Sequence, residues 1–267
     1  MKKIALYVIC TLPFTGIADL VAYYPLDNNA NDASGNGHNG AITGTGISFG
    51  QAGANAATGL SADFTGSGHI DVPYNTALNT ADFTVTLWTH ADVAGGGGSN
   101  YRSPITNRDD VSSGAETHGW VIYNDNAGNW SFWNGRGVGQ SWHQLDGGPV
   151  QTGTWTHLAI SYDSTTSTKS LYVNGSPAGS VNAPFSPNGT QMENLHIGGG
   201  GDSGGQFRFD GRIDDIGIFN TALTQSEIMN IMNNGVIPEP SAGLLFALGL
   251  VLITTLYRTN STQGASS

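Results

Sequence analysis

Oxygen-bearing side chains gather early in the chain, in a segment that turn-forming residues dominate. Asp27, Asp32 and Asn36 lie within a short stretch, and Asp214 and Asp215 add two adjacent carboxylates much later. Clustered carboxylate and amide oxygens are the ligands that Ca²⁺ prefers in proteins. Asn and Asp residues in such segments also cap turns, because their side chains accept hydrogen bonds from nearby backbone amides. The sequence therefore allows either a structural calcium site or a set of capped turns.

Flat aromatic side chains offer a second kind of chemistry. The chain holds six Trp and nine Tyr among many Asn and Gly residues. Sugars are held by stacking an aromatic face on the C–H side of the ring, with polar loops contacting the hydroxyls. Trp133 alternates with the neighbouring Trp130 and Phe132 and so points to the opposite face of its strand. Together with Trp142, in a polar stretch, and Tyr101, it is a candidate ligand-binding residue. Burial of these rings beneath a loop is the alternative.

Catalytic residue patterns are weak. A glycosidase needs two carboxylates about 5 to 10 Å apart, and Glu116, Glu193 and Glu227 are isolated in the sequence. Asp214 and Asp215 are adjacent on an expected strand, so their side chains should point to opposite faces. The seven histidines show no ligand-like spacing, and no Gly-x-Ser-x-Gly sequence occurs. We therefore expect a protein that is not an enzyme.

Composition narrows the classes of partner. The 267 residues carry a formal net charge of −11, which disfavours binding to the phosphates of nucleic acid.

The N-terminal segment predicts export. Lys2 and Lys3 precede an apolar stretch and small residues near position 18, which is typical of a secretory signal peptide over residues 1–18. Cys10, the single cysteine, lies inside it, so removal of the signal would leave no thiol for disulfides or thiolate metal sites.

The elements that must position these side chains are mostly strands. Alternating apolar residues predict strands over residues 83–88 and 158–162, with Leu87 and Ile160 inside. Asn174-Gly175 favours a two-residue hairpin turn, and Val173 before it should also lie inside. A late strand over residues 213–218 should pair with the first one, over residues 20–26.

One short helix is expected near the end of this domain. Thr224 is its N-cap, and Glu227 completes a capping box ahead of Ile228. We predict an all-β fold in which two antiparallel sheets pack face to face, plus this helix. Trp88 and Trp155 lie in central strands, and we expect them to be buried.

The C-terminal region resembles the PEP-CTERM sorting tail of exported bacterial proteins. Pro238, Glu239 and Pro240 precede an apolar run over residues 242–257, and Arg258 follows it. The resemblance implies a sorting segment over 236–260 with a transmembrane helix, then a polar tail over 261–267. It also implies an exosortase-type sorting protease as a partner and a transient contact with the membrane. A permanent anchor that is never cut is the alternative.

Four separated segments resemble the laminin-G-like, concanavalin-A-like jelly-roll modules of bacterial surface proteins. Their order and spacing cover nearly all of residues 19–235, which implies a two-sheet jelly roll and places the strand of Asp214 and Asp215 near the first strand. The architecture serves enzymes, lectins and adhesive modules alike, so it implies no activity. The four segments are residues 20–27 with 31–40, 83–88, 153–163 with 171–175, and 209–223.

These observations predict an exported, non-catalytic protein of the bacterial envelope or exopolysaccharide. Its expected role is lectin-like or adhesive binding of an extracellular glycan or matrix component at the cell surface, with calcium as an optional structural cofactor. A structural matrix protein without a ligand site is the first alternative. A glycan-cleaving enzyme with an unrecognised site is the second.

Overall fold

The computed structural model describes residues 20–95, 100–111, 116–189, 191–201 and 206–237. The expected signal peptide over residues 1–18, the Pro238-Glu239-Pro240 motif and the expected transmembrane helix all lie outside this set. Within the described ranges, no helix is long and apolar enough to cross a membrane.

Sheet A contains eight strands in the order β16-β15-β14-β6-β18-β4-β3, with β1 also paired to β18. The first strand therefore pairs with the last one, as the sequence predicts. The strands of sheet A are β1 (Leu20–Tyr24), β3 (Ile47–Ala52), β4 (Leu60–Phe64), β6 (Phe83–Ala91), β14 (Trp155–Asp163), β15 (Thr168–Val173), β16 (Ser176–Asn182) and β18 (Gly211–Phe219).

Sheet B has seven strands in the order β13-β11-β10-β7-β17-β5-β2, and a small sheet C has the order β12-β9-β8. The strands of sheet B are β2 (Ala41–Thr43), β5 (His69–Val72), β7 (Arg102–Thr106), β10 (Trp120–Asn124), β11 (Asn129–Asn134), β13 (His143–Pro149) and β17 (Leu195–Ile197). Those of sheet C are β8 (Asp109–Val111), β9 (Glu116–His118) and β12 (Gly137–Val138), and a 3₁₀ turn, η1, spans Thr76–Leu78.

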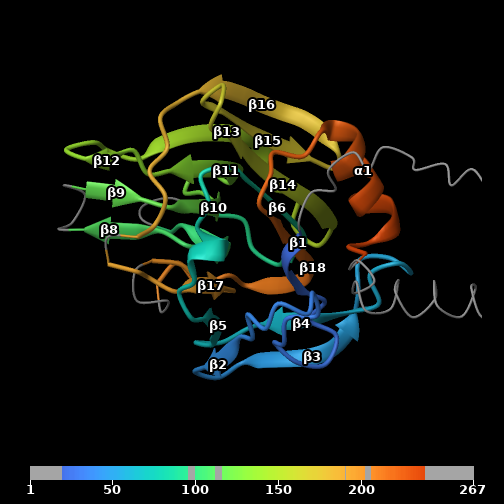
Figure 1. Cartoon of the computed structure of the whole chain (residues 1–267). Helices are drawn as coiled ribbons and strands as arrows, with labels where there is room; N and C mark the ends of the chain where they lie inside the picture. The colour runs from blue at the N-terminus through green and yellow to red at the C-terminus, as the bar shows by residue number, and fades with distance from the viewer. Residues whose placement is uncertain (1–19, 96–99, 112–115, 190, 202–205, 238–267) are drawn as a thin grey trace, which may run out of the picture.

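The core lies between sheets A and B, which form the two layers of a sandwich (Figure 1). Every pairing between these strands is antiparallel, so the predicted all-β sandwich is confirmed. Leu87 and Ile160 are fully buried in this core, and Val173 is half-buried against it. Burial of one such aliphatic side chain stabilises the fold by about 1.5 to 3 kcal/mol.

Sheet B presents two different faces, and the register of its strands defines them. Residues that pair across antiparallel strands point to the same face. One row of paired residues lies in the core: Ile70, Ile197, Ile105, Ile122 and Phe132. The adjacent row therefore lies on the outer face: Asp71, His196, Thr106, Val121, Trp133 and Gln144.

The expected burial of Trp88 and Trp155 is wrong, because both side chains are half-buried on the outer face of sheet A. Val85 and Leu87 point into the core, so alternation turns Trp88 outward. The ring of Trp155 contacts the imidazole of His90 at 5.5 Å between centroids. A strand can thus be central in the sheet and still present one aromatic face outward.

Helix α1 (Gln225–Asn234) packs on the outer side of sheet A (Figure 1). Thr224 is the N-cap and exchanges hydrogen bonds with Glu227, which confirms the predicted capping box. Ile228 is its buried residue and joins a small cluster with Ala159 and Leu223. The predicted hairpin turn is also present, since Asn174 and Gly175 separate β15 from β16 with φ angles of 49° and 72°.

Candidate functional site

Four aromatic rings meet on the outer face of sheet B. Tyr123 on β10 lies 5.5 Å from Trp133 on β11 and 5.4 Å from Phe207, measured between ring centroids. Tyr101, just before β7, contacts Tyr123 at 5.0 Å and Trp133 at 5.5 Å. The two pairs with Trp133 are edge-to-face, an arrangement that aromatic rings prefer over a flat sandwich. Tyr101, Trp133 and Phe207 each keep part of their surface accessible to solvent.

Arg108 connects this cluster to Trp142. Its guanidinium carbon lies 5.0 Å from the ring centroid of Trp142 and 5.4 Å from that of Phe207. The same side chain donates a hydrogen bond of 2.7 Å to the hydroxyl of Tyr123 and pairs with Asp110. The three sequence-predicted residues, Tyr101, Trp133 and Trp142, are therefore brought into one continuous cluster, which we call the aromatic site.

Polar side chains lie beside the aromatic site on the same face. Gln144 pairs in register with Trp133, and its amide donates to Asp146 at 2.5 Å and to Asp125 at 3.4 Å. The other carboxylate oxygen of Asp125 accepts the backbone amides of Ala127 and Asn129 at 2.9 Å and so fixes the β10–β11 turn. The site thus combines half-exposed rings with amide and carboxylate groups.

Sequence reasoning missed Arg108, Tyr123 and Phe207 as members of this site. Tyr123 sits in a strand that reads as core, and Phe207 is distant in the chain. The one usable signal was alternation, because Tyr123 follows Ile122, which points inward. The contact between Phe207 and Tyr123 depends on tertiary structure and has no local signature.

Two of the predicted calcium ligands organise the loop between β1 and β2. Asp32 accepts backbone amides from Tyr23, Ser34 and His38 at 2.8 to 3.0 Å. Burial acts to raise the pKa of Asp32, but the hydrogen bonds from Ser34 and from the backbone amides outweigh it and lower the pKa. Asn36 donates through its amide to the carbonyls of Leu20 and Val21 at 2.9 Å. These are the capped-turn contacts that the sequence left as the alternative.

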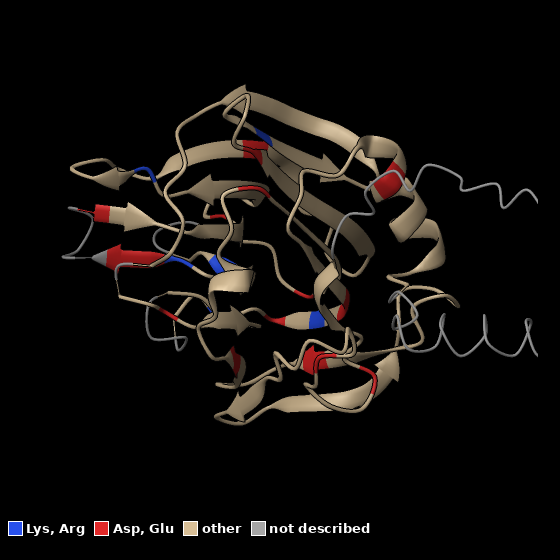
Figure 2. Cartoon of the chain, in the orientation of Figure 1, with Lys and Arg blue, Asp and Glu red and all other residues tan. Residues whose placement is uncertain are grey.

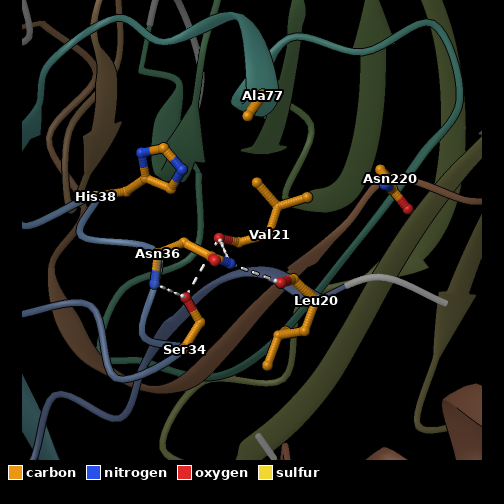
Figure 3. A pocket seen from close by; sticks show the side chains of 7 residues that line it. All are labelled: Leu20, Val21, Ser34, Asn36, His38, Ala77 and Asn220. Carbon is orange, nitrogen blue, oxygen red and sulfur yellow. Dashed lines mark hydrogen bonds between the residues drawn. The ribbon is translucent and has the colours of Figure 1, made fainter. Parts of the chain in front are cut away.

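A surface pocket of about 540 Å³ adjoins this loop (Figure 3). In Figure 3 the side-chain amide of Asn36 reaches toward the carbonyls of Leu20 and Val21, and His38 lies on the opposite side of Asn36. The lining also includes Ser34, Ala77 and Asn220. The described residues that line it offer hydrogen-bonding groups, and none of them is a Trp, Tyr or Phe on which a sugar could stack.

The remaining predicted calcium ligands, Asp27, Asp214 and Asp215, gather around Tyr23. The Tyr23 hydroxyl donates to Asp215 at 2.6 Å, and Thr58 donates to Asp214 at 2.7 Å. The pKa of the Tyr23 hydroxyl is raised by burial and by its neighbour Asp215.

The backbone at Asp215 departs from a regular strand. A bulge falls between Asp214 and Gly217, and Asp215 adopts a φ angle of 53°. The expected alternation of the two carboxylates assumed a regular strand, and the extra residue at the bulge breaks it. Burial raises the pKa of Asp214 to about 7 and that of Asp215 to about 6, and Asp215 also raises the pKa of Asp214.

Asp27 lies at a smaller pocket of about 240 Å³, which the asparagines 28, 29 and 31 also line. Its carboxylate accepts the backbone amide of Leu60 at 2.6 Å and adds negative charge near Asp214 and Asp215. The predicted calcium ligands therefore form two groups, a loop group of Asp32 with Asn36 and a bulge group of Asp27 with the two late aspartates. Tyr23 links the groups through its backbone amide and its hydroxyl.

Several solved structures share this architecture. Domain 4 of AbnA, a GH43 extracellular arabinanase from Geobacillus stearothermophilus solved with arabinotriose, is 25% identical, with a TM-score of 0.61 over 80% of this chain and 98% of that domain. The binding domain of Paraclostridial Mosquitocidal Protein 1 is 19% identical, with a TM-score of 0.59 over 80% of this chain and 52% of that one.

A third structure, the Ruminococcus gnavus IT-sialidase CBM40 bound to α2,3-sialyllactose, is 17% identical, with a TM-score of 0.50 over 60% of this chain and 86% of that one. A comparison with curated proteins found no match. The family model described as the concanavalin A-like lectin/glucanases superfamily matches residues 64–229, more than half of the sequence. The two-sheet sandwich and this match agree, and the chain belongs to the concanavalin A-like lectin/glucanases superfamily.

Proposed function

We propose that this protein binds a neutral glycan at the aromatic site on the outer face of sheet B. The observation that carries the proposal is that Tyr101, Trp133 and Trp142 belong to one cluster: the first two contact Tyr123, and Arg108 connects Tyr123 to Trp142. These three half-exposed rings come from separate segments of the chain. Half-exposed aromatic rings there give a sugar ring a surface on which to stack its C–H face.

The polar groups beside the rings suit hydroxyl recognition. Asp146 and Gln144 lie at the exposed surface, where carboxylate and amide oxygens accept hydrogen bonds from sugar hydroxyls. Such groups fix the orientation of a ligand whose affinity comes from the rings.

The charge of this surface favours a neutral glycan over an acidic one. Arg108 is paired with Asp110, and Asp125 and Asp146 add two further acidic groups to the same face. Figure 2 shows more acidic segments on β8 and β9 of sheet C. An acidic sugar such as a sialic acid or a uronic acid would therefore meet like charge. The formal net charge of −11 also repels an acidic sugar at longer range.

The arabinanase domain supports this choice, since its structure contains arabinotriose, a neutral oligosaccharide.

Binding rather than cleavage is supported by the positions of the carboxylates. The two carboxylates whose pKa values burial raises most, Asp214 and Asp215, belong to sheet A and are buried in contacts with Thr58 and Tyr23. Within the described part of the aromatic site, the carboxylates of Asp110, Asp125 and Asp146 have protein partners.

The test compares two tryptophans of similar exposure on opposite sheets. Binding of arabinotriose, arabinan and a panel of other neutral glycans is measured by titration calorimetry for wild type, Trp133→Ala and Trp155→Ala. We expect Trp133→Ala to lose at least about tenfold in affinity, or about 1.4 kcal/mol, because a central aromatic contact is lost. Trp155→Ala, on the outer face of sheet A, should bind like wild type.

Each other outcome has a defined meaning. Equal losses in both variants would place the sugar elsewhere. Tighter binding of sialyllactose than of neutral sugars would contradict the charge argument. Failure to bind any glycan would leave the structural matrix role, and release of products from a polysaccharide panel would establish cleavage.

We also propose that the protein is exported and that its C-terminal tail is processed at the membrane by an exosortase-type protease. The proposal rests on the sequence of residues 1–18 and on the Pro238-Glu239-Pro240 motif with its apolar run. Intact mass measurement of the exported protein tests both steps. A mature species that still ends at Ser267, in a host with the sorting machinery, would show that the tail only anchors.

A further inference from the structure

Two histidines and an aspartate from neighbouring strands meet on the outer face of sheet B. The Nε2 atom of His69 lies 3.1 Å from Oδ1 of Asp71, and Nδ1 of His196 lies 2.6 Å from the same oxygen. One donor atom from each residue falls within 4.8 Å of the other two. His69 and Asp71 are on β5, and His196 reaches them because β17 pairs with β5. Sequence spacing hides this group, since the two histidines are far apart in the chain.

We propose that His69, Asp71 and His196 bind a zinc ion. Zinc is typically held at 2.0 to 2.2 Å by imidazole nitrogen and carboxylate oxygen in a tetrahedron, which sets its donor atoms roughly 3.3 Å apart. The separations of 3.1 and 2.6 Å from Oδ1 of Asp71 are shorter than this value, and the two histidine nitrogens lie within 4.8 Å of each other, so side-chain shifts of less than about 1.5 Å would bring the three donors to it. A set of two imidazoles and one carboxylate suits zinc rather than calcium or magnesium, which take oxygen ligands.

A neighbouring side chain holds the carboxylate in the required orientation. Thr43 on β2 donates a hydrogen bond of 2.6 Å from its hydroxyl to Oδ2 of Asp71. The other oxygen, Oδ1, is thereby directed toward the two imidazoles. Metal-ligating carboxylates commonly have such an outer hydrogen-bond partner, which orients the ligand.

The surroundings leave the group accessible from one side. His69 and His196 are buried, whereas the side chain of Asp71 is 24% exposed. An ion can therefore approach past Asp71 while the imidazoles stay fixed by the sheet. Three protein ligands leave a fourth position for water or another ligand.

The zinc site is separate from the aromatic site, although both lie on one face. His196 belongs to the same transverse row as Trp133, with Thr106 and Val121 between them. Three strand spacings separate the two residues, or roughly 14 Å. The zinc ion would link β5 to β17 and stabilise this part of sheet B, and the inference does not depend on glycan binding.

The test uses the purified full chain after treatment with a chelator. Zinc binding is measured by calorimetry and by metal content, and thermal unfolding is followed with zinc, calcium and magnesium. The variants are His69→Gln, Asp71→Asn and His196→Gln. The matched control is His90→Gln on sheet A, whose imidazole lies 3.0 Å from the carboxylate of Asp92.

We expect one zinc ion per chain and a rise in melting temperature with zinc only. Each ligand variant should lose more than about 100-fold in zinc affinity, and Thr43→Val should lose about 10-fold to 100-fold because it removes the outer partner. His90→Gln should match wild type. Circular dichroism of each variant verifies its fold.

Two results would overturn the inference. The first is no zinc binding to wild type at micromolar concentration, which would leave a hydrogen-bonded His-Asp-His group. The second is zinc binding that is unchanged in all three ligand variants. If those variants do not fold, cobalt is added to wild type as a spectroscopic probe. A cobalt spectrum without tetrahedral nitrogen ligation would then contradict the site.

Discussion

Lys169 on β15 of sheet A donates a hydrogen bond of 2.7 Å to the backbone carbonyl of His143 on β13 of sheet B. A second bond of 3.1 Å reaches the carbonyl of Phe132, and the ammonium nitrogen lies 4.8 Å from the centroid of that ring. Lys169 is fully buried, so a polar amino group connects the two layers of the sandwich. Burial lowers its pKa to about 7, and Arg136 acts in the same direction.

Replacing this lysine should remove a pH dependence of stability. Between pH 7 and about 10.5 the unfolded chain keeps the Lys169 proton that the folded chain has lost, so wild-type stability should rise with pH in this window. The slope is at most about 1.4 kcal/mol per pH unit. Lys169→Met should flatten it. Urea unfolding at several pH values measures the slope, and an unchanged slope in Lys169→Met would contradict the assignment.

The carboxylate of Asp214 should make folding stability fall as the pH rises, the opposite of the effect of Lys169, and it should do so at lower pH. Its pKa of about 7 means that, between about pH 4 and 7, the folded chain keeps a proton that the unfolded chain has lost. Wild-type stability from this group is therefore present at low pH and lost as pH rises through 7. Asp214→Asn should reduce the slope and raise stability at pH 8 relative to wild type. Its amide oxygen can still accept from Ala54 and Thr58, which bond Oδ2 in wild type.

The same urea series tests this prediction, with Asp163→Asn as control, an aspartate at the end of β14 that accepts the backbone amide of Thr165. An Asp214→Asn variant that is less stable than wild type at pH 8, with the same slope between pH 4 and 7, would show that the carboxylate is ionised in the folded chain.

Arg108 should be needed for the geometry of the aromatic site. Arg108→Lys keeps the charge but loses the planar group that stacks on Trp142 and bonds the Tyr123 hydroxyl. We expect a loss of about 1 to 2 kcal/mol in glycan affinity, since a cation–π contact and a charged hydrogen bond are weakened together. Arg136→Lys, which changes a half-buried arginine bonded to Ser141, is the control. Equal calorimetric affinities for the two variants would contradict a role for Arg108.

The capping box should contribute measurably to stability. Thr224→Ala removes the side chain that accepts from the Glu227 amide, which should cost about 1 kcal/mol. For a chain of this size, that corresponds to a fall of about 2 to 4 °C in melting temperature. Thr221→Ala, at an exposed position before the helix, should leave the melting temperature nearly unchanged. A fall of the same size in both variants would show that the cap is not the cause.

Calcium binding remains a prediction that thermal unfolding can test. If Asp32 and the carboxylates of Asp214 and Asp215 bind calcium, the ion should raise the melting temperature of wild type, because it binds the folded state alone. Asp32→Ala should lose this effect. Four curves are compared, for wild type and Asp32→Ala, each with calcium and with excess chelator. Identical curves would leave the hydrogen bonds from Tyr23, Ser34 and His38 as the whole role of Asp32.

Local patterns in the sequence were sufficient for several elements. Alternation predicted β6 and β14, and the positive φ values that Asn174 and Gly175 tolerate predicted the hairpin. Thr224 and Glu227 predicted the start of the helix to the residue. These signals are local because each depends on backbone geometry within a few neighbouring residues.

Longer-range features were predicted less well. The expected burial of Trp88 failed because membership of a central strand was taken to mean burial on both faces. The bulge at Asp215 was not visible either, since an extra residue in a strand is defined by the partner strand that it faces.

The sequence by itself determined the class of fold, the turn and helix signals, and the residue types that could stack on a sugar. The tertiary structure decided which of these residues meet. Trp133 is connected to Trp142 through Tyr123 and Arg108, and His69 meets His196 through Asp71. The physical reason is the register of sheet B, which brings residues from distant segments into one row on one face, and no local pattern encodes which strands will pair.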